Sequence, residues 1–150
     1  MKIALYPGSF DPITKGHEDV VLRLLPLFDK FYIAIGENSE KKTLFLIEQR
    51  QEWIQRCFSH IPKVHVISYE GLTVELCTRL EVNYMVRGVR NFIDFQHEQE
   101  LARLNKELSG IETLFCMASP SLAHISSSFV RELYLNHGNY TKYMPENCFK

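Results

Sequence analysis

The stretch "YPGSFDPITKGHEDVV", residues 6–21, joins a short apolar run to a segment whose apolar positions recur at helical spacing. Gly8 and Gly16 leave the backbone open to the close approach of a ligand. Pro7 and Pro12 stiffen the loop between them. Free amides at the start of the helix, with the positive end of its dipole, favour an anion. The stretch therefore predicts a strand, an anion-binding turn and a helix.

The same alternation of strand and helix continues along the chain. Five apolar runs too short to be helices are predicted as strands, at residues 2–6, 31–36, 63–68, 82–88 and 112–117. Helical spacing predicts helices near residues 16–27, 46–60, 72–80, 92–108 and 127–136. Such alternation implies right-handed crossovers and a parallel sheet covered on both faces. We expect an α/β chain, residues 1–150, forming a single Rossmann-like doubly wound domain with a five-stranded parallel sheet, and a short polar tail over 139–150.

The composition is that of an ordinary globular chain. It has 150 residues, of which 45% are hydrophobic and 23% charged, and a formal net charge of -1. Without a basic field, DNA or RNA is not an expected partner, and any bound phosphate should be small and locally held. The first apolar run meets Pro7 and Gly8 too soon for a signal peptide, and no run is long enough to span a bilayer. We expect no membrane partner and a cytoplasmic location.

The cysteines suit a reducing compartment. They lie far apart in the sequence and form no C-x-x-C pair: Cys57, Cys77, Cys116 and Cys148. The first three fall within apolar segments, so buried free thiols are expected.

The topology indicates where a ligand should bind. In open parallel sheets ligands lie beyond the carboxyl ends of the strands, where the strand order reverses. The stretch 6–21 follows the first predicted strand, and in its "TKGH" both Thr14 and His17 can point from the helix start into one spot. Glycine and proline would also suit a simple turn, and His17 could cap the helix or face solvent. The combination of Thr14 with His17 favours a ligand site.

Three blocks carry a family resemblance. "YPGSFDPITKGH" resembles the T-x-G-H form of the H-x-G-H signature of the nucleotidyltransferase superfamily. "VRGVRNFIDFQHE" and "HISSSFVRE" resemble the two later blocks of bacterial phosphopantetheine adenylyltransferases. The likeness runs from residue 2 to about residue 147, and three blocks in this order are a specific match. The chain has no G-x-x-x-x-G-K-S/T loop and no K-M-S-K-S sequence, which argues against a P-loop enzyme and an aminoacyl-tRNA synthetase.

The resemblance implies a reaction: the reversible transfer of adenylate from ATP to 4'-phosphopantetheine, giving dephospho-coenzyme A and pyrophosphate. The attacking phosphate oxygen is already ionised at neutral pH, so the reaction needs neither a nucleophilic Ser or Cys nor a strong base. Negative charge builds on the α-phosphate and the leaving pyrophosphate. Catalysis is then largely alignment and preorganised positive charge.

The resemblance also assigns the catalytic groups. It implies that His17 contacts the α-phosphate, that Lys41 bridges the acceptor phosphate and ATP, and that Arg90 binds the ATP phosphates. It also implies that Arg87 binds the acceptor phosphate. Arginine suits both positions because its planar fork holds two phosphate oxygens at once. Two alternatives stay open: Lys42 in place of Lys41, and surface ion pairing for the two arginines.

The implied ATP site draws on the first loop, the end of the fourth strand and the start of the last helix. Its members are Ser9, Phe10, His17, Gly88, Val89, Arg90, Glu98, Leu122, Ala123, His124, Ile125, Ser126, Ser127 and Ser128. Glu98 would contact the ribose side of the nucleotide, and one of the three serines is expected only to cap the helix. Asp94 either orients an arginine or is a solvated charge.

The implied acceptor site combines a cationic anchor with a partly apolar groove. Its members are Ser9, Gly36, Lys41, Leu72, Thr73, Arg87, Leu101 and Asn105. Leu101 and Asn105 lie at i and i+4, so they share one helix face and offer an apolar surface and an amide. A place in the core would explain Leu72 and Leu101 almost as well.

Three positions depart from the family pattern. Leu122 stands where an aromatic residue is often found near the adenine, and His97 stands where tyrosine is frequent. Ser9 replaces the commoner threonine and keeps its hydroxyl. The departures at Leu122 and His97 bear on how the adenine is packed.

No cluster of Asp, Glu or His has the spacing of a protein-built metal site, so Mg²⁺ is expected to arrive with ATP. The family pattern suggests a homohexamer. Two other functions remain: adenylyl or cytidylyl transfer to another small phosphorylated acceptor, such as nicotinamide mononucleotide, and a nucleotide-sensing module without turnover. The second would be expected to lack His17 or Arg90, and both are present.

Overall fold

A computed structural model describes residues 1–150 and has one parallel sheet of five strands. The strands are β1 (Ile3–Gly8), β2 (Lys30–Gly36), β3 (Val64–Tyr69), β4 (Tyr84–Val89) and β5 (Glu112–Met117), in the order β3-β2-β1-β4-β5. The helices are α1 (Lys15–Leu24), α2 (Ile47–Phe58), α3 (Thr73–Arg79), α4 (Phe92–Ser109) and α5 (Ser127–Leu135). The predicted α/β class with a five-stranded parallel sheet is confirmed.

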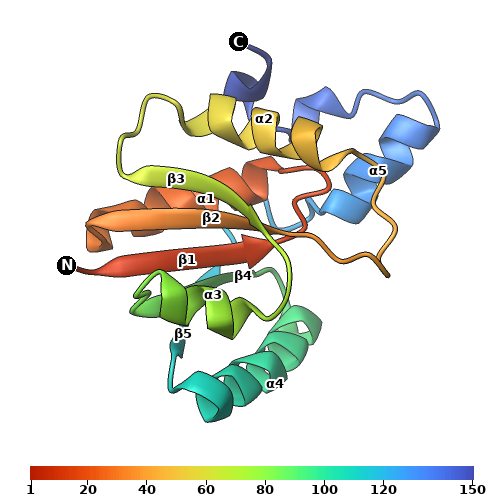
Figure 1. Ribbon diagram of the computed structural model, residues 1–150. Helices are drawn as coiled ribbons and strands as arrows, with labels where there is room; N and C mark the ends of the chain where they lie inside the picture. Colours follow the sequence, from red (N-terminus) through yellow and green to blue (C-terminus); the bar gives the residue numbers. More distant parts are fainter.

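Helices cover both faces of the sheet. Figure 1 shows α2 and α5 on one side and α3 and α4 on the other. The larger core cluster joins the sheet to α1, α2 and α5 and includes Val21, Ile54 and Val130. The smaller one joins it to α3 and includes Leu5 and Val74. The central strands β1 and β2 are buried on both faces, as their continuous apolar sequences require.

The strand order reverses between β1 and β4, and there the two strands separate. β1 pairs with β2 along its whole length, from Ile3 to Gly8. It pairs with β4 only at Ala4 and Leu5. The carboxyl ends of β1 and β4 therefore diverge, which opens space at the place where ligands of such sheets bind.

The predicted elements are all present, with ends displaced by at most three residues, the largest difference being at the end of the first helix. The first strand continues beyond the predicted 2–6 to Gly8. Pro7 is tolerated in it because its neighbour β4 has already separated at this point. The first helix ends at Leu24, and Leu25–Leu27 form a 3-10 turn around Pro26.

The segment 139–150, expected to be a short polar tail, folds onto the protein. It forms two 3-10 turns, η2 (Thr141–Tyr143) and η3 (Glu146–Phe149). Met144 and Cys148 are fully buried in the larger core cluster. The apolar side chains scattered through the segment pack against this core. The polar residues between them led to the prediction of a tail.

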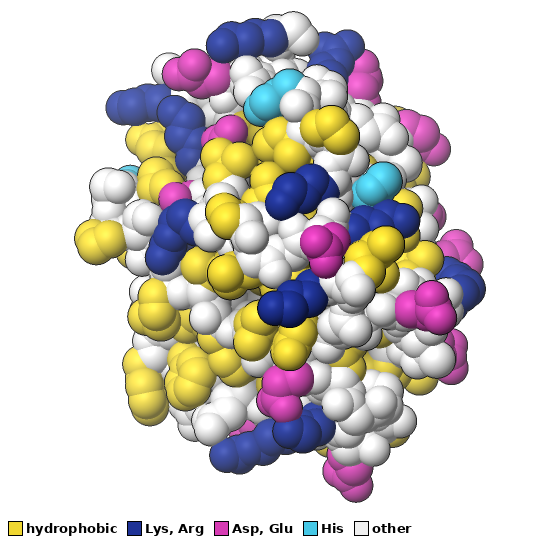
Figure 2. All heavy atoms as spheres, turned by 90° about the vertical axis from the view of Figure 1, so that its left-hand side faces the viewer, with side chains coloured by type: hydrophobic (Ala, Val, Ile, Leu, Met, Phe, Trp, Pro, Cys, Tyr) yellow, Lys and Arg dark blue, Asp and Glu magenta, His cyan; other side chains and the backbone are white.

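The surface at the amino ends of the strands, opposite the site, mixes positive and negative side chains with apolar ones (Figure 2). None of the helices combines the length and apolar character needed to cross a bilayer. All four cysteines are free and buried, as predicted.

Candidate active site

A cavity of about 330 Å³ opens where β1 and β4 diverge. It is lined by the first loop, the end of β4, α4 and the start of α5. Of the residues predicted for the site, it gathers Ser9, Phe10, His17, Lys41, Arg87, Gly88, Val89, Arg90, Glu98, Leu122, Ile125, Ser126, Ser127 and Ser128. Residues far apart in the sequence thus meet around one hollow at the carboxyl edge of the sheet.

His17 is held by the start of its own helix. Thr14 is the N-cap residue of α1, its N–H donates to Nδ1 of His17 at 2.9 Å, and its hydroxyl accepts from the His17 N–H. Because Nδ1 accepts, the proton of the neutral ring is on Nε2. The capping role considered for His17 is therefore real, and it leaves Nε2–H as a donor toward the cavity that His17 lines.

The imidazole is neutral at physiological pH. Burial, then the positive charges of Arg87 and Arg90, lower the pKa of His17 from 6.5 to about 4. Two aromatic rings pack beside it. The centroid of the Phe10 ring lies 5.0 Å from that of the imidazole and 5.4 Å from that of the Tyr6 ring, both in edge-on contacts. A neutral donor of fixed tautomer can stabilise charge that develops on a phosphate oxygen.

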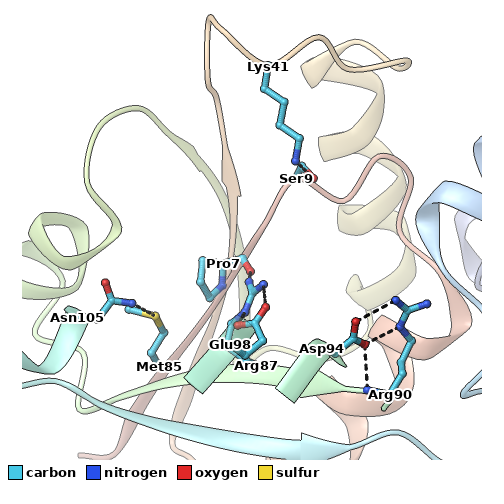
Figure 3. A network of polar contacts seen from close by, with 9 residues as sticks. All are labelled: Pro7, Ser9, Lys41, Met85, Arg87, Arg90, Asp94, Glu98 and Asn105. Atoms are coloured by element: carbon cyan, nitrogen blue, oxygen red, sulfur yellow. Dashed lines mark hydrogen bonds and ion pairs between the residues drawn. The ribbon is translucent and has the colours of Figure 1, made fainter. Parts of the chain in front are cut away.

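Arg87 and Glu98 form a bidentate ion pair. Arg87 Nε and Nη2 donate to the Glu98 carboxylate at 2.7 and 2.6 Å, and Nη1 donates to the carbonyl of Pro7 (Figure 3). The pair raises the pKa of Arg87 against the opposing effect of burial. The structure thus shows Glu98 as the group that orients Arg87, whereas its contact with the ribose side of ATP stays a prediction.

Arg90 has a similar partner one helical turn away. Its Nε and Nη2 donate to the Asp94 carboxylate at 2.9 and 3.3 Å, and its backbone N–H donates to the same group at 3.2 Å (Figure 3). Of the two roles considered for Asp94, the structure supports the orientation of an arginine. Asn91 caps α4 directly before it, accepting from the Asp94 N–H.

Lys41 enters the cavity from the loop after β2. Its Nζ lies 3.4 Å from the Ser9 hydroxyl, and Figure 3 shows the side chain reaching down to it. Lys42 is exposed and does not line the cavity. The geometry therefore favours Lys41 of the two neighbouring lysines.

The three serines before α5 have different partners. Ser126 is the N-cap residue and accepts from the Phe129 N–H. Ser127 donates to the carbonyl of Pro12 at 2.8 Å, and Ser128 accepts from Arg131 at 3.1 Å. The expectation that one of them caps the helix is confirmed, and the N-terminus of α5 faces the cavity.

A second cavity of about 230 Å³ continues from Arg87 and Glu98 along α4. Thr73, Leu101 and Asn105 line it, as the shared helix face of the last two predicted. Asn105 Nδ2 lies 3.6 Å from the Met85 sulfur, a weak partner that a ligand amide can replace (Figure 3). Gly36 borders a third hollow together with Ser9 and Lys41.

Some predicted residues do not reach these hollows. Leu72, 57% exposed, lines none of the three, and neither do Ala123 or His124. His97 is exposed on α4, whereas Leu122 lines the main cavity in the place considered for the adenine.

The sequence interpretation missed two buried charged residues beside the site, Asp11 and Arg50, each 4% exposed. Arg50 follows Ile47 at i+3 and precedes Trp53 and Ile54, so it stands on the apolar face of α2. A charge within an apolar stripe was the available signal. No group of three or more His, Cys, Asp and Glu side chains is placed to hold a metal ion.

Comparisons with known proteins agree with this arrangement. The sequence matches the cytidylyltransferase-like family over residues 5–133. A phosphopantetheine adenylyltransferase from Flavobacterium psychrophilum is 48% identical, over 97% of this chain and 97% of its own. One from Porphyromonas gingivalis is 46% identical, over 96% of this chain and 94% of its own. The fold resembles a bifunctional NMN adenylyltransferase/ADP ribose pyrophosphatase from Francisella tularensis, with a TM-score of 0.76 and 16% identity over 97% of this chain and 45% of that one.

Proposed function

This chain belongs to the phosphopantetheine adenylyltransferase family, and from that membership we propose how its cleft performs the reaction. The enzyme transfers an adenylyl group from ATP to 4'-phosphopantetheine in coenzyme A biosynthesis, giving dephospho-coenzyme A and pyrophosphate, and the reaction is reversible. The observation that supports the proposal is the convergence of His17, Lys41, Arg87 and Arg90 on one hollow at the diverging ends of β1 and β4.

ATP binds with its phosphates between the first loop and the N-terminus of α5. His17 donates its Nε2–H to the α-phosphate, and this bond strengthens as negative charge develops there. Arg90 binds the phosphates that leave as pyrophosphate. Mg²⁺ comes with ATP and is held mainly by phosphate and water, because the protein offers Lys and Arg at this place rather than carboxylates free to bind it.

The acceptor phosphate lies between Lys41 and Arg87, and its oxygen attacks the α-phosphate. No side chain has to remove a proton, since this oxygen is already ionised. The pantetheine arm extends from Arg87 into the second cavity, past Leu101 to Asn105, where an amide of the arm meets the Asn105 side chain. A second cavity that is lined by Arg87, Leu101 and Asn105 favours an acceptor with a long flexible arm over a mononucleotide.

We propose a homohexamer in the cytoplasm. Large apolar side chains left exposed along α4, among them Phe92, Ile93, Leu104 and Leu108, support burial against another subunit. Four free cysteines support a reducing compartment. The sedimentation coefficient of the purified protein tests the subunit number.

The acceptor is tested by pyrophosphate release. Purified protein with ATP and Mg²⁺ is supplied with 4'-phosphopantetheine, nicotinamide mononucleotide or a phosphorylated alcohol, and we expect release only with the first. Pantetheine without its phosphate serves as a matched control and should be inactive, because it lacks the attacking oxygen. Release with nicotinamide mononucleotide but not with phosphopantetheine would overturn the assignment.

A further inference from the structure

Arg50 of α2 is a buried cation without a carboxylate partner. The residue is 4% exposed, and none of its nitrogens forms an ion pair. It donates instead to two backbone carbonyls: Nη1 to Ser9 at 2.6 Å and Nε to Phe45 at 3.0 Å. A buried charge is costly unless its bonds are good, so this arrangement calls for an explanation.

One of these carbonyls belongs to the turn that faces the phosphates. The Ser9–Phe10 peptide is trans, so its C=O and N–H point in opposite directions. Because Arg50 holds the Ser9 oxygen on the side of α2, the Phe10 N–H is directed away from α2. Phe10 lines the main cavity, and its N–H has no hydrogen-bond partner within the protein. Because it has no partner within the protein, this N–H is available to a ligand in the cavity.

The backbone at Phe10 needs to be held in place. Its φ of 46° lies in the left-handed region, which is unfavourable for a residue with a side chain. On the far side of Phe10, Arg131 of α5 donates to the carbonyl of Asp11 at 2.9 Å. Two arginines from different helices therefore bind the turn: Arg50 binds the carbonyl before Phe10, and Arg131 binds the carbonyl after it.

A buried carboxylate completes the connection to the loop that carries Lys41. Asp11 accepts from the N–H groups of Leu44 and Phe45 at 2.8 and 2.9 Å. Arg50 and Asp11 therefore hold the two ends of the same residue, Phe45, through its C=O and its N–H. Asp11 and Arg50 thus bind the two peptide groups on either side of the Phe45 α-carbon, and these hydrogen bonds join the two loops.

We propose that Arg50 is a positioning residue for the reaction: by holding the Ser9 carbonyl it directs the Phe10 N–H into the cleft, where that amide binds a phosphate of ATP. The cationic hydrogen bond also polarises the Ser9–Phe10 peptide and makes its N–H a stronger donor. The inference rests on the proposed function, because it needs ATP in the main cavity.

The direct test follows the Phe10 amide by NMR. Protein labelled with ¹⁵N-phenylalanine gives at most ten backbone signals, since the chain has ten phenylalanines, and Phe10→Leu assigns the one of interest. We expect ATP or inorganic pyrophosphate to move the Phe10 amide proton downfield in the unmodified protein. An amide that does not respond to either would overturn the proposal without any variant of Arg50.

The second test compares two lysine substitutions on one helix. Arg50→Lys keeps the charge and loses the fork, while Arg56→Lys changes an exposed arginine of the same helix that pairs with Glu52. We expect Arg50→Lys to reduce the downfield shift and to lower kcat/KM for ATP about tenfold or more, with the KM for phosphopantetheine changed less than about threefold. Arg56→Lys should leave all three unchanged.

The outcomes separate this inference from the proposed function. Unmodified protein that releases no pyrophosphate with phosphopantetheine contradicts the function, whatever Arg50 does. Active protein in which Arg50→Lys keeps the full shift and the full kcat/KM contradicts the inference alone. Equal losses for both substrates would assign Arg50 to stability, which also contradicts it. If Arg50→Lys does not fold, Arg50→Gln, which keeps a hydrogen-bond donor and loses the charge, takes its place in the same comparison.

Discussion

Two arginines face the cleft, and each is held by a carboxylate of α4, yet the two pairs differ in burial. In the Arg87–Glu98 pair the side chains are 28% and 11% exposed. In the Arg90–Asp94 pair they are 37% and 28% exposed. Arg87 also donates to the Pro7 carbonyl of β1, whereas Arg90 makes side-chain bonds only to Asp94, four residues along the chain.

The same kind of arginine–carboxylate pair therefore holds one arginine firmly and the other loosely. Arg87 joins β4, α4 and β1, so it is a fixed anchor that can still offer the two N–H groups left of its five. Arg90 is tied only to its own local segment by a more exposed pair, which contributes little to stability and can exchange partners. A fixed anchor suits one end of an acceptor, and an adaptable one suits phosphates that leave as pyrophosphate.

The largest effect is expected at His17, whose pKa both arginines lower. If both arginines mainly hold ligands, His17→Ala should lower kcat about a hundredfold or more, the usual cost of losing one donor to developing charge. Both KM values should change less than about threefold, because the contact strengthens in the transition state. Steady-state kinetics measures this, and near-normal turnover would remove His17 from the mechanism.

The difference in burial predicts unequal losses of stability. Glu98→Ala leaves Arg87 without its partner in a largely enclosed place and should lower the free energy of unfolding by about 3 kcal/mol. Asp94→Ala, the matched change in the more exposed pair, should cost about 1 kcal/mol or less. Urea unfolding of both variants measures the difference, and equal losses would contradict the distinction.

The two arginines should also separate in kinetics. Arg87→Ala should raise the KM for phosphopantetheine about tenfold or more, as expected for a lost charged hydrogen bond. Its effect on the KM for ATP should be much smaller. Arg90→Ala should raise the KM for ATP and lower kcat as well. If the variants change the same constants, the two pairs do not serve different substrates.

A further effect concerns pH, because burial and then the charges of both arginines shift the pKa of His17. Burial, Arg87 and Arg90 place the pKa of folded His17 near 4, below the ordinary 6.5. Between these values the unfolded chain binds more protons, so stability due to the neutral His17 is fully present above pH 6.5 and declines toward pH 4. Urea unfolding at pH 7 and pH 5 should show a larger decline for the unmodified protein than for His17→Asn. Equal declines would contradict the shift.

Much of the site followed from local sequence. Thr14 and His17 lie three residues apart at a helix start, so their meeting is a local property of the chain. Leu101 and Asn105 share a helix face for a similar reason. The interpretation missed Arg50 and Asp11 because they bind backbone groups of distant loops. Arg50 binds Ser9, 41 residues away, and Asp11 binds Leu44 and Phe45, 33 and 34 residues away. A sequence pattern does not show which carbonyl a buried charge will hold.

The sequence by itself determined the alternation of strands and helices, the family, and the start of α1 capped by Thr14, because these depend on periodicity and on residues close together in the chain. Only the tertiary structure decided that β1 and β4 separate after two pairs, that Glu98 and Asp94 hold different arginines, and that residues 139–150 pack on the core. These features depend on contacts between distant segments, whose free energy is gained only when the whole sheet and its helices pack together.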